Sequence, residues 1–292
     1  MIYIGMQINI IQPYSFNSNK KPSFGGWERV VYKQTSNVFA EELNHRNNTY
    51  IFRDGHIIPS IVDFMVFRYM DTPKVNTYVY GCSNGSEPYS VLMSMISRYG
   101  EEMGQKFTKI KAFDYDSEAI IKAKSKYLPI SIEEFEKICD YTLGKFNKFF
   151  DGESIGISKD FNRYLNKDTV FNVFGESKRF EDSIIIGKEV RLRDKYADMI
   201  EYSVANILDD YKNIEPDNSV VFARNFWPYL TTNERSKLAK NLGNQLNDTS
   251  MLVLGNFDMN SVAGITNLLG KNGFIRTGKT EPIFEKIIGW TA

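Results

Sequence analysis

Two glycines between an apolar run and an amphipathic run mark the stretch of this chain best suited to bind a small ligand. Residues 77–80 favour a β-strand, and the residues from Pro88 onward favour a helix. Gly81 and Gly85 lie between them, where a missing β-carbon permits a tight turn and lets a ligand approach backbone N–H groups closely. In α/β sheets such junctions hold nucleotide-like ligands, although the same pattern also occurs in turns with a purely structural role.

A carboxylate ends the next predicted strand. Residues 109–114 form a strand that finishes in Asp114, and Ser117 is placed to cap a helix over 118–126. An acid at this position can accept hydrogen bonds from both ribose hydroxyls of a nucleoside bound over the first turn. The spacing from Gly85 is longer than in the dinucleotide-binding fingerprint, and the pattern G-x-G-x-x-G is missing, so the sequence disfavours NAD.

The composition argues against several other kinds of chemistry. His45 and His56 are the only histidines among 292 residues, so we predict no transition-metal site. The 36 basic and 36 acidic residues cancel, and bulk charge therefore predicts no binding to nucleic acid or to an anionic membrane.

Cysteine usage and hydropathy indicate the cellular setting. Cys82 and Cys139 are the only cysteines, which rules out a disulfide framework and favours a reducing environment. Residues 1–15 are apolar but carry no basic leader, and no run in the chain is long enough to cross a bilayer. We therefore expect a cytoplasmic protein without membrane insertion.

The remaining elements alternate as in a doubly wound α/β sheet. Strands are predicted at 77–80, 109–114, 199–204, 219–223 and 251–254, with a closing antiparallel pair at 274–277 and 283–288. Helices are predicted at 59–70, 118–126, 231–244 and 262–269, and after Pro88.

Two segments do not fit the alternation. Between 128 and 195 a helical run at 132–141 is followed by short strand-like runs at 169–174, 183–187 and 189–193, which predicts an inserted, small antiparallel β subdomain. Residues 1–46 are too few for a core of their own, although the spacing over 27–43 favours a helix. We expect them to form a short N-terminal extension.

Five segments resemble, in the same order, motifs of one family, the CheR glutamate O-methyltransferases of chemotaxis receptors, which use S-adenosylmethionine. Asn47-x-Thr49-x-x-Phe52-Arg53-Asp54 is similar to N-x-T-x-F-F-R-[DE], residues 81–90 (GCSNGSEPYS) to S-T-G-E-E-P-Y-S, residues 113–116 (FDYD) to S-D-I-D, residues 190–208 to V-R-V-R…V-N-L-L, and residues 222–230 (FARNFWPYL) to F-C-R-N-V-x-I-Y-F.

The resemblance implies a fold and a domain plan. The expected fold is α/β, a class I, Rossmann-like methyltransferase sheet of seven strands with the inserted β subdomain. The methyltransferase domain would cover 47–292, interrupted by 128–195. Residues 1–46 show no arginine-rich helix of the kind that addresses the receptor in this family. We therefore expect a divergent member that lacks the usual N-terminal helical domain.

The resemblance also implies roles for the matched residues. The methionine and sulfonium end of the cofactor would meet Asn47, Thr49 and Arg53, with Glu87 near its amino group, Gly81 and Gly85 in the turn, Asp114 on the ribose beside Tyr115, Asn206 and Ile207 flanking the adenine, and Asn225 and Phe226 forming the floor. Arg53 and Tyr229 match the family's catalytic arginine and tyrosine.

This chemistry would need neither a metal nor a histidine base. A glutamate carboxylate has an intrinsic pKa of about 4.3, so it is an ionised nucleophile at neutral pH. A dry pocket that aligns its oxygen with the methyl group and sulfur would favour in-line displacement. The acceptor would then be a protein, docked through the inserted β subdomain.

Two alternatives stay open. Asn225-Phe226-Trp227-Pro228-Tyr229 resembles the N-P-P-Y signature of methyltransferases that act on amino groups, with two residues instead of none between Asn and Pro. The chain could also be a non-catalytic module that binds S-adenosylmethionine or S-adenosylhomocysteine. The sequence names neither the methyl acceptor nor the oligomeric state.

Overall fold

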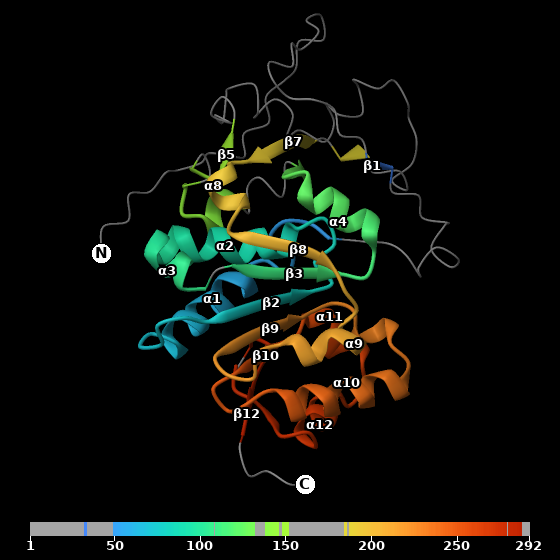
Figure 1. The fold of residues 1–292 in the computed structure, drawn as a ribbon. Helices are drawn as coiled ribbons and strands as arrows, with labels where there is room; N and C mark the ends of the chain where they lie inside the picture. The colour runs from blue at the N-terminus through green and yellow to red at the C-terminus, as the bar shows by residue number, and fades with distance from the viewer. Residues whose placement is uncertain are drawn as a thin grey trace, which may run out of the picture.

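The chain is organised around one large sheet with helices on both faces (Figure 1). The computed structural model describes residues 32–33, 49–107, 109–131, 138–145, 148–151, 184–185, 187–278 and 280–287. The described sheet consists of β2 (Asn76–Tyr80), β3 (Ile110–Asp114), β8 (Ile200–Val204), β9 (Ser219–Ala223), β10 (Met251–Val253), β11 (Phe274–Arg276) and β12 (Ile283–Lys286).

The strand order confirms the predicted seven-stranded methyltransferase-type sheet. The strands lie in the order β11-β12-β10-β9-β2-β3-β8. β12 is antiparallel to both of its neighbours, whereas the pairs from β10 to β8 are parallel. After β2 the chain adds β3 and β8 on one side and then returns to add β9 on the other. The switch point between β2 and β9 is where open α/β sheets bind their ligands, at the carboxyl ends of the strands.

Alternating side chains of the central strands point to opposite faces of the sheet and pack into two separate hydrophobic cores. Val79 and Phe222 point into a cluster with α1 (Ile57–Arg68), α2 (Ser86–Tyr99) and α4 (Ser117–Lys124). Their neighbours Tyr80 and Val221 point into a second cluster with α9 (Ile207–Asp210), α10 (Thr232–Gln245) and α12 (Ile265–Gly270). All five residues of β9 are buried, because a central parallel strand is covered on both faces.

Shorter helices complete the layers. They are α3 (Glu101–Lys106), α8 (Asp194–Ala197), α11 (Asn256–Ser261) and the 3-10 turns η2 (Tyr211–Asn213) and η3 (Trp227–Tyr229). The sequence did not predict α11, and the helix predicted at 262–269 begins only at Ile265.

Side-chain hydrogen bonds at the N-cap fix where two of the helices begin. Asp116, and not Ser117 as predicted, caps α4 by accepting a hydrogen bond from the Glu118 N–H at 2.9 Å. Of the two threonines at 231 and 232, either of which the sequence allowed as the cap of α10, it is Thr231 that caps the helix, in a reciprocal capping box with Glu234.

The predicted antiparallel β subdomain is present as a three-stranded sheet. It consists of β4 (Tyr127–Ser131), β7 (Gly187–Leu192) and β5 (Phe150–Asp151), in the order β4-β7-β5. In Figure 1 it lies beyond β8, on the opposite side from α10 and α12. The strand predicted at 169–174 lies outside the described residues.

A second, very short ladder involves the N-terminal segment. β1 (Tyr32–Lys33) pairs antiparallel with β6 (Ile184–Ile185). The helix predicted over 27–43 is therefore wrong at Tyr32 and Lys33, where backbone pairing with β6 replaces helical hydrogen bonds. The rest of that segment lies outside the described residues.

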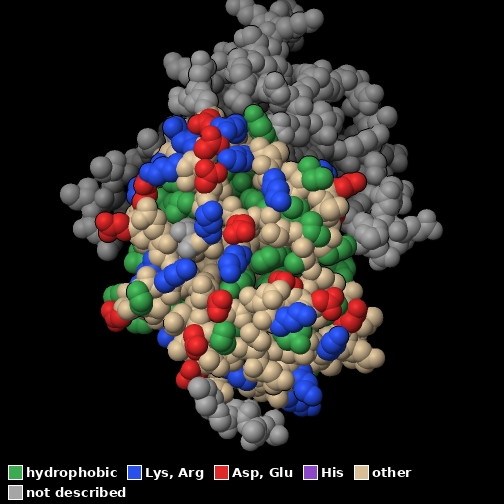
Figure 2. Space-filling model, viewed as in Figure 1, with side chains coloured by type: hydrophobic (Ala, Val, Ile, Leu, Met, Phe, Trp, Pro, Cys, Tyr) green, Lys and Arg blue, Asp and Glu red, His purple; other side chains and the backbone are tan. Residues whose placement is uncertain are grey.

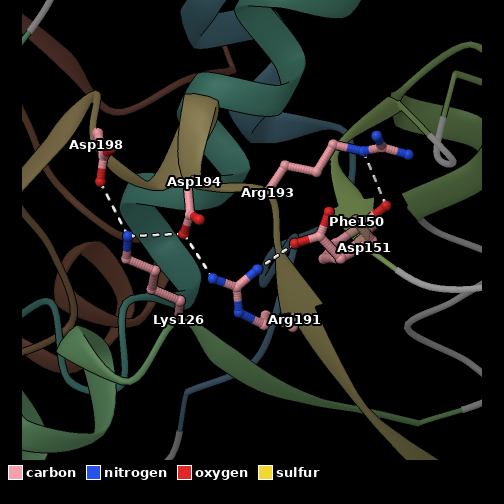
Figure 3. Close-up of polar contacts among 7 residues, drawn as sticks. All are labelled: Lys126, Phe150, Asp151, Arg191, Arg193, Asp194 and Asp198. Atoms are coloured by element: carbon pink, nitrogen blue, oxygen red, sulfur yellow. Dashed lines mark hydrogen bonds and ion pairs between the residues drawn. The ribbon is translucent and has the colours of Figure 1, made fainter.

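Ion pairs join the small sheet to α8 (Figure 3). Arg191 of β7 pairs with Asp151 of β5 and, at 2.6 Å, with Asp194 of α8. Lys126 lies 2.9 Å from Asp194 and 3.0 Å from Asp198. Figure 2 shows acidic and basic side chains gathered together in this region, over β5 and α8. These side chains are partly exposed, so each pair stabilises the junction only modestly.

Candidate functional site

The turn after β2 has the backbone conformation that its glycines predict. Gly81 has a φ of +74°, and Gly85, with a φ of +89°, is the N-cap residue of α2. A β-carbon on Gly85 would lie 2.6 Å from the Tyr202 hydroxyl, and one on Gly81 would lie 3.3 Å from the Phe226 ring. Gly85 is buried and makes room for aromatic side chains of the protein itself, whereas Gly81 is exposed.

Asp114 clamps this turn from the end of β3. One carboxylate oxygen accepts a hydrogen bond from the Ser83 N–H at 2.8 Å, and the other accepts one from the Asp116 N–H at 2.9 Å. The side chain is buried, and burial raises the pKa of Asp114 against the opposing effect of these hydrogen bonds. The Tyr115 backbone also hydrogen-bonds to this carboxylate. A carboxylate has about four acceptor sites, so Asp114 can still accept from a hydroxyl of a ligand. The neighbouring Tyr115 is 60% exposed.

The end of β8 lies directly beside Asp114. The Ala205 N–H donates to the Asp114 carbonyl at 2.9 Å, which places Asn206 at the same edge of the sheet. Asn206 caps α9, because its side-chain oxygen accepts from the Leu208 N–H at 3.0 Å. Ile207 is buried beneath this cap.

A buried arginine ends β9. The Arg224 side chain is 1% exposed and donates to Glu87 at 2.8 Å and to Asp54 at 2.6 Å. Its Nε also donates to the Leu254 carbonyl at 3.3 Å. One guanidinium therefore ties together the ends of β9 and β10, the first turn of α2 and the segment before α1.

Asp258 of α11 holds the loop that follows Arg224. Its carboxylate accepts hydrogen bonds from the backbone N–H groups of Asn225 at 2.6 Å, Gly255 at 2.8 Å and Trp227 at 3.1 Å. Asn225 has a φ of +65°, a conformation that L-residues rarely adopt, and Asp258 is completely buried. The carboxylate thus fixes the loop that places Phe226 against Gly81.

Arg53 precedes Asp54, the residue that pairs with Arg224, and its charge acts on Glu87. Burial raises the pKa of Glu87, and the charges of Arg224 and Arg53 oppose that rise. Thr49 is half-buried at the start of the same segment, and Asn47 lies outside the described residues.

Tyr229 lies at the exposed end of the loop that follows Arg224. It is 59% exposed on η3, and its ring centroid is 6.0 Å from that of Phe257 in α11.

Glu87 and Asp114 flank the same turn. Burial raises the pKa of the Cys82 thiol, and the charges of Asp114 and Glu87 raise it further. One oxygen of Glu87 is bonded to Arg224, whereas the other, Oε1, is buried and has no hydrogen-bond partner among the described residues. A buried acceptor of this kind suits a ligand with an ammonium group, because an unpaired buried carboxylate oxygen is costly.

The sequence of most of the chain matches a family model, "CheR methyltransferase, SAM binding domain", over residues 47–165 and 180–270. The chain belongs to the CheR methyltransferase family. It is therefore an enzyme of the S-adenosylmethionine-dependent methyltransferase class, as the motifs predicted.

Individual relatives of this CheR-family chain are distant. A chemotaxis protein methyltransferase of Borreliella burgdorferi is 22% identical over 262 residues, which cover 84% of this chain and 76% of the relative. The crystal structure of magnesium protoporphyrin IX methyltransferase from Synechocystis covers 78% of this chain and 80% of its own, with 12% identity and a TM-score of 0.38. A TehB-like SAM-dependent methyltransferase from Corynebacterium glutamicum covers 78% and 84%, with 11% identity and a TM-score of 0.35. Neither solved structure is similar enough to bear on the acceptor.

The cofactor of this CheR-family protein is S-adenosylmethionine, and the site fits its functional groups. The unpaired oxygen of Glu87 suits the ammonium, and the acceptor capacity that remains on Asp114 suits a ribose hydroxyl. In the described part of the chain, no group of three or more His, Cys, Asp and Glu side chains is arranged to hold a metal ion. The helices described there are also too short or too polar to cross a membrane.

Sequence reasoning missed three residues that build this CheR site: Asp54, Arg224 and Asp258. The first two stand inside the matched motifs, and Arg224 directly follows four apolar residues at 220–223. A charged residue in that position is a signal that could have been used, because a buried charge requires a partner. Asp258 gave no such signal, since α11 itself was not predicted.

Proposed function

We propose that this chain transfers the methyl group of S-adenosylmethionine to a glutamate carboxylate of a protein. The CheR family match supports this acceptor, and the relative from Borreliella burgdorferi is named a chemotaxis protein methyltransferase. We also propose that the catalytic domain covers 47–292 and that 128–195 is an insertion in it. The chain passes from α4 into β4 of the small sheet, and it returns from β7 through α8 to β8 of the large sheet.

The proposed cofactor contacts follow the strand ends. Glu87 Oε1 receives the ammonium, and Asp114 receives the ribose hydroxyls. The remaining contacts are Gly81 and Gly85 in the turn, Tyr115, Asn206 and Ile207 around the adenine, Asn225 and Phe226 below the nucleoside, and Thr49 and Arg53, with Asn47, at the methionine end.

The observation that carries the choice of acceptor is the position of Arg53. The next residue, Asp54, shares the Arg224 guanidinium with Glu87, so the segment that carries Arg53 lies beside the methionine end of the proposed cofactor site. An anionic acceptor that approaches the methyl group from this side is attracted and oriented by Arg53. A neutral amine gains nothing from that cation, because its attack creates positive charge there.

The reaction requires no general base, because glutamate with an intrinsic pKa of about 4.3 is ionised at neutral pH. The cofactor supplies a methyl group on a sulfonium, which leaves as a neutral thioether. A carboxylate oxygen of the acceptor forms the new bond to the methyl carbon, and the electrons of the carbon–sulfur bond stay on sulfur. One positive and one negative charge disappear, so exclusion of water by the loop 225–229 favours the reaction.

Tyr229 acts as a positioning group for the acceptor in this proposal. It does not act as a base, because the acceptor carboxylate is already ionised. Its exposure on η3 places it where a protein acceptor can reach it, and the contact with Phe257 holds the ring at the edge of the site.

The small sheet is the proposed docking surface for the protein acceptor. β4 and β5 are its edge strands, and an edge strand offers main-chain hydrogen-bonding groups to an extended peptide. Tyr127 of β4 is 44% exposed and can contact a side chain of such a peptide.

The acceptor class is tested with methyl-tritiated S-adenosylmethionine, the full chain and a protein extract from its host cells. We expect label on protein that mild alkali releases as volatile methanol, because esters hydrolyse under these conditions. We expect Arg53→Ala and Tyr229→Phe to lower the rate about tenfold or more. Arg276→Ala and Tyr99→Phe are matched surface controls and should leave it unchanged.

Three other results would contradict parts of this proposal. Base-stable label would show an amino or other acceptor and overturn the carboxylate assignment. If no transfer occurs but calorimetry shows tight binding of S-adenosylhomocysteine, the chain is a binding module. If neither site variant changes the rate, Arg53 and Tyr229 are not catalytic residues.

The docking surface is tested by Tyr127→Ala. We expect a several-fold higher KM for the protein acceptor, with unchanged kcat and unchanged affinity for S-adenosylhomocysteine. An unchanged KM would argue against docking on β4.

A further inference from the structure

The turn that carries Arg53 is held in a conformation that its residues disfavour. Phe52 has a φ of +50°, Asp54 one of +69° and Gly55 one of +65°. Only glycine adopts this left-handed region without cost, and a bulky residue such as Phe52 is a clear exception there. Such a turn persists only where the surrounding structure holds it. The contacts around residues 52–55 therefore fix the backbone from which the Arg53 side chain extends.

Ser90 of α2 holds the first residue of this turn. Its hydroxyl accepts a hydrogen bond from the Phe52 N–H at 2.8 Å and donates one to the Ser86 carbonyl at 2.7 Å. Because the hydroxyl proton is used on Ser86, the oxygen is oriented as an acceptor for Phe52. Ser90 is 1% exposed and Phe52 is completely buried, so bulk water does not compete for this bond.

Tyr141, within the proposed insertion 128–195, contacts the turn at both of its ends. Its ring centroid lies 5.1 Å from that of Phe52, at an interplanar angle of 49°. Its hydroxyl lies against Gly55, where an added β-carbon would be only 3.2 Å away. Arg53 therefore stands in the sequence between two residues that the same tyrosine contacts.

The segment that carries Tyr141 is itself anchored to the large domain. Ile138 is completely buried in the core that also contains residues of α1 and α2. Lys145 Nζ donates to the Ser97 carbonyl near the end of α2 at 2.6 Å. Ser90 and Tyr141 thus hold the turn from one framework, which consists of α2 and the segment packed on it.

We propose that Ser90 and Tyr141 are positioning residues that hold the turn 52–55 and so place Arg53 for methyl transfer. This inference rests on the role proposed above for Arg53. It gives the insertion a second task besides the proposed docking of the acceptor, because one of its residues helps to place the proposed catalytic arginine.

The test is a double-mutant cycle with Arg53→Ala. Ser90→Ala removes the acceptor of the Phe52 N–H, and Tyr141→Leu removes the ring. Each is made in the wild type and in the Arg53→Ala chain. The rate is that of alkali-labile transfer from saturating methyl-tritiated S-adenosylmethionine to the protein extract of the host cells. Calorimetry measures the affinity for S-adenosylhomocysteine, and circular dichroism checks that each variant is folded.

We expect each single variant to lower the rate about threefold to tenfold, because a small displacement of an oriented group slows the reaction. The affinity for S-adenosylhomocysteine should change by less than about twofold. In the Arg53→Ala chain neither change should lower the rate further, since both act through Arg53. Tyr141→Phe keeps the ring against Phe52 and should restore most of the rate.

Hydrogen exchange at residues 51–56 is a second readout, which needs no acceptor. We expect it to be about threefold to tenfold faster in Ser90→Ala and in Tyr141→Leu, as the loss of one buried contact implies. If one of the two variants does not fold, the other variant, together with Tyr141→Phe, decides the test.

Two variants are matched controls. Ser94 is also a completely buried serine of α2, but its hydroxyl has no hydrogen-bond partner in the part of the chain that the structure describes. Ser94→Ala should change neither the rate nor the exchange at 51–56. Tyr196→Leu removes a ring pair of the same kind, with Phe149 at 5.0 Å, which joins α8 to the insertion. It should leave the exchange at 51–56 unchanged.

The outcomes separate this inference from the function it rests on. If the wild type transfers no methyl group, or if Arg53→Ala leaves the rate unchanged, the proposed role of Arg53 fails and the inference fails with it. If Arg53→Ala slows the reaction but the Ser90 and Tyr141 variants do not, the inference fails alone. It also fails alone if they slow the Arg53→Ala chain as much as the wild type, or if exchange at 51–56 is unchanged. If only one of the two couples to Arg53, the assignment of the other is wrong.

Discussion

At the scale of single residues, three buried charged side chains hold the site in place. Asp114 joins β3 to the turn after β2, Arg224 joins β9 to α2, and Asp258 joins α11 to the loop after β9. Burying a charge costs free energy unless hydrogen bonds or an opposite charge compensate it. In each case at least one partner belongs to a different segment, so the cost of burial is fully offset only when the strand ends are assembled correctly.

Gly85 gives a prediction at this scale. Gly85→Ala should destabilise the protein by more than about 1 to 2 kcal/mol, the cost of a left-handed alanine, because the new methyl group also meets Tyr202. Gly264 is the matched control: it also is a left-handed N-cap residue, but a β-carbon there meets nothing within 4 Å. Urea unfolding of both variants measures the difference. Equal losses would show that the contact with Tyr202 has no energetic effect.

At the scale of elements, short helices that follow the strands set the shape of the site. α11 contributes little to either core, but it carries Asp258 and so fixes the loop over 225–229. Asn206, which is predicted to contact the adenine, is also the N-cap residue of α9. The geometry of the site therefore depends on the first turns of these elements, where backbone N–H groups need acceptors.

The clamp formed by Asp258 predicts a specific pH dependence. Burial raises the pKa of Asp258 from 3.8 to about 6, against three backbone hydrogen bonds that lower it. The native carboxyl therefore binds a proton more readily than the unfolded one. Its contribution to stability is complete below about pH 4 and is lost as the pH rises through about 6, by about 3 kcal/mol.

Urea unfolding of the wild type and Asp258→Asn between pH 4 and pH 7 measures this contribution. The variant cannot ionise there, so we expect the wild type to lose stability relative to it as the pH rises. The other buried carboxyls titrate in both proteins and cancel in the comparison. A difference that is constant across this range would contradict the raised pKa.

At the scale of the whole molecule, the site exists only where separate segments meet. The carboxyl ends of β2, β3, β8, β9 and β10 lie at one edge of the sheet, and the segment before α1 closes it through Asp54. The small sheet is attached near β8 through α8, so the proposed docking surface and the cofactor site are carried by neighbouring elements.

Binding of S-adenosylhomocysteine should therefore protect several distant segments at once. We expect hydrogen exchange to slow more at 81–87, 206–208 and 225–229 than in β4 and β7. At a ligand concentration of about 100 times Kd, the added stability should be about 2.7 kcal/mol. Protection confined to a single segment would show that these strand ends do not share one ligand.

The sequence by itself determined the elements and their class. β9 was predictable because four successive apolar residues, 220–223, suit a strand that is buried on both faces, and the glycine turn was predictable because Gly81 and Gly85 need positive φ values. These signals are local: each residue type reports the conformation or burial of its own position. The CheR motifs added the order of the segments, and hence the expected cofactor.

Only the tertiary structure decided how the segments hold one another. The bond between Arg224 and Asp54 spans 170 residues, and no local pattern pairs those two side chains. Asp258 of α11 likewise accepts hydrogen bonds from Asn225 and Trp227, which lie 33 and 31 residues earlier in the sequence. Long-range contacts are absent from sequence periodicity, because they arise only when the sheet brings its strand ends together.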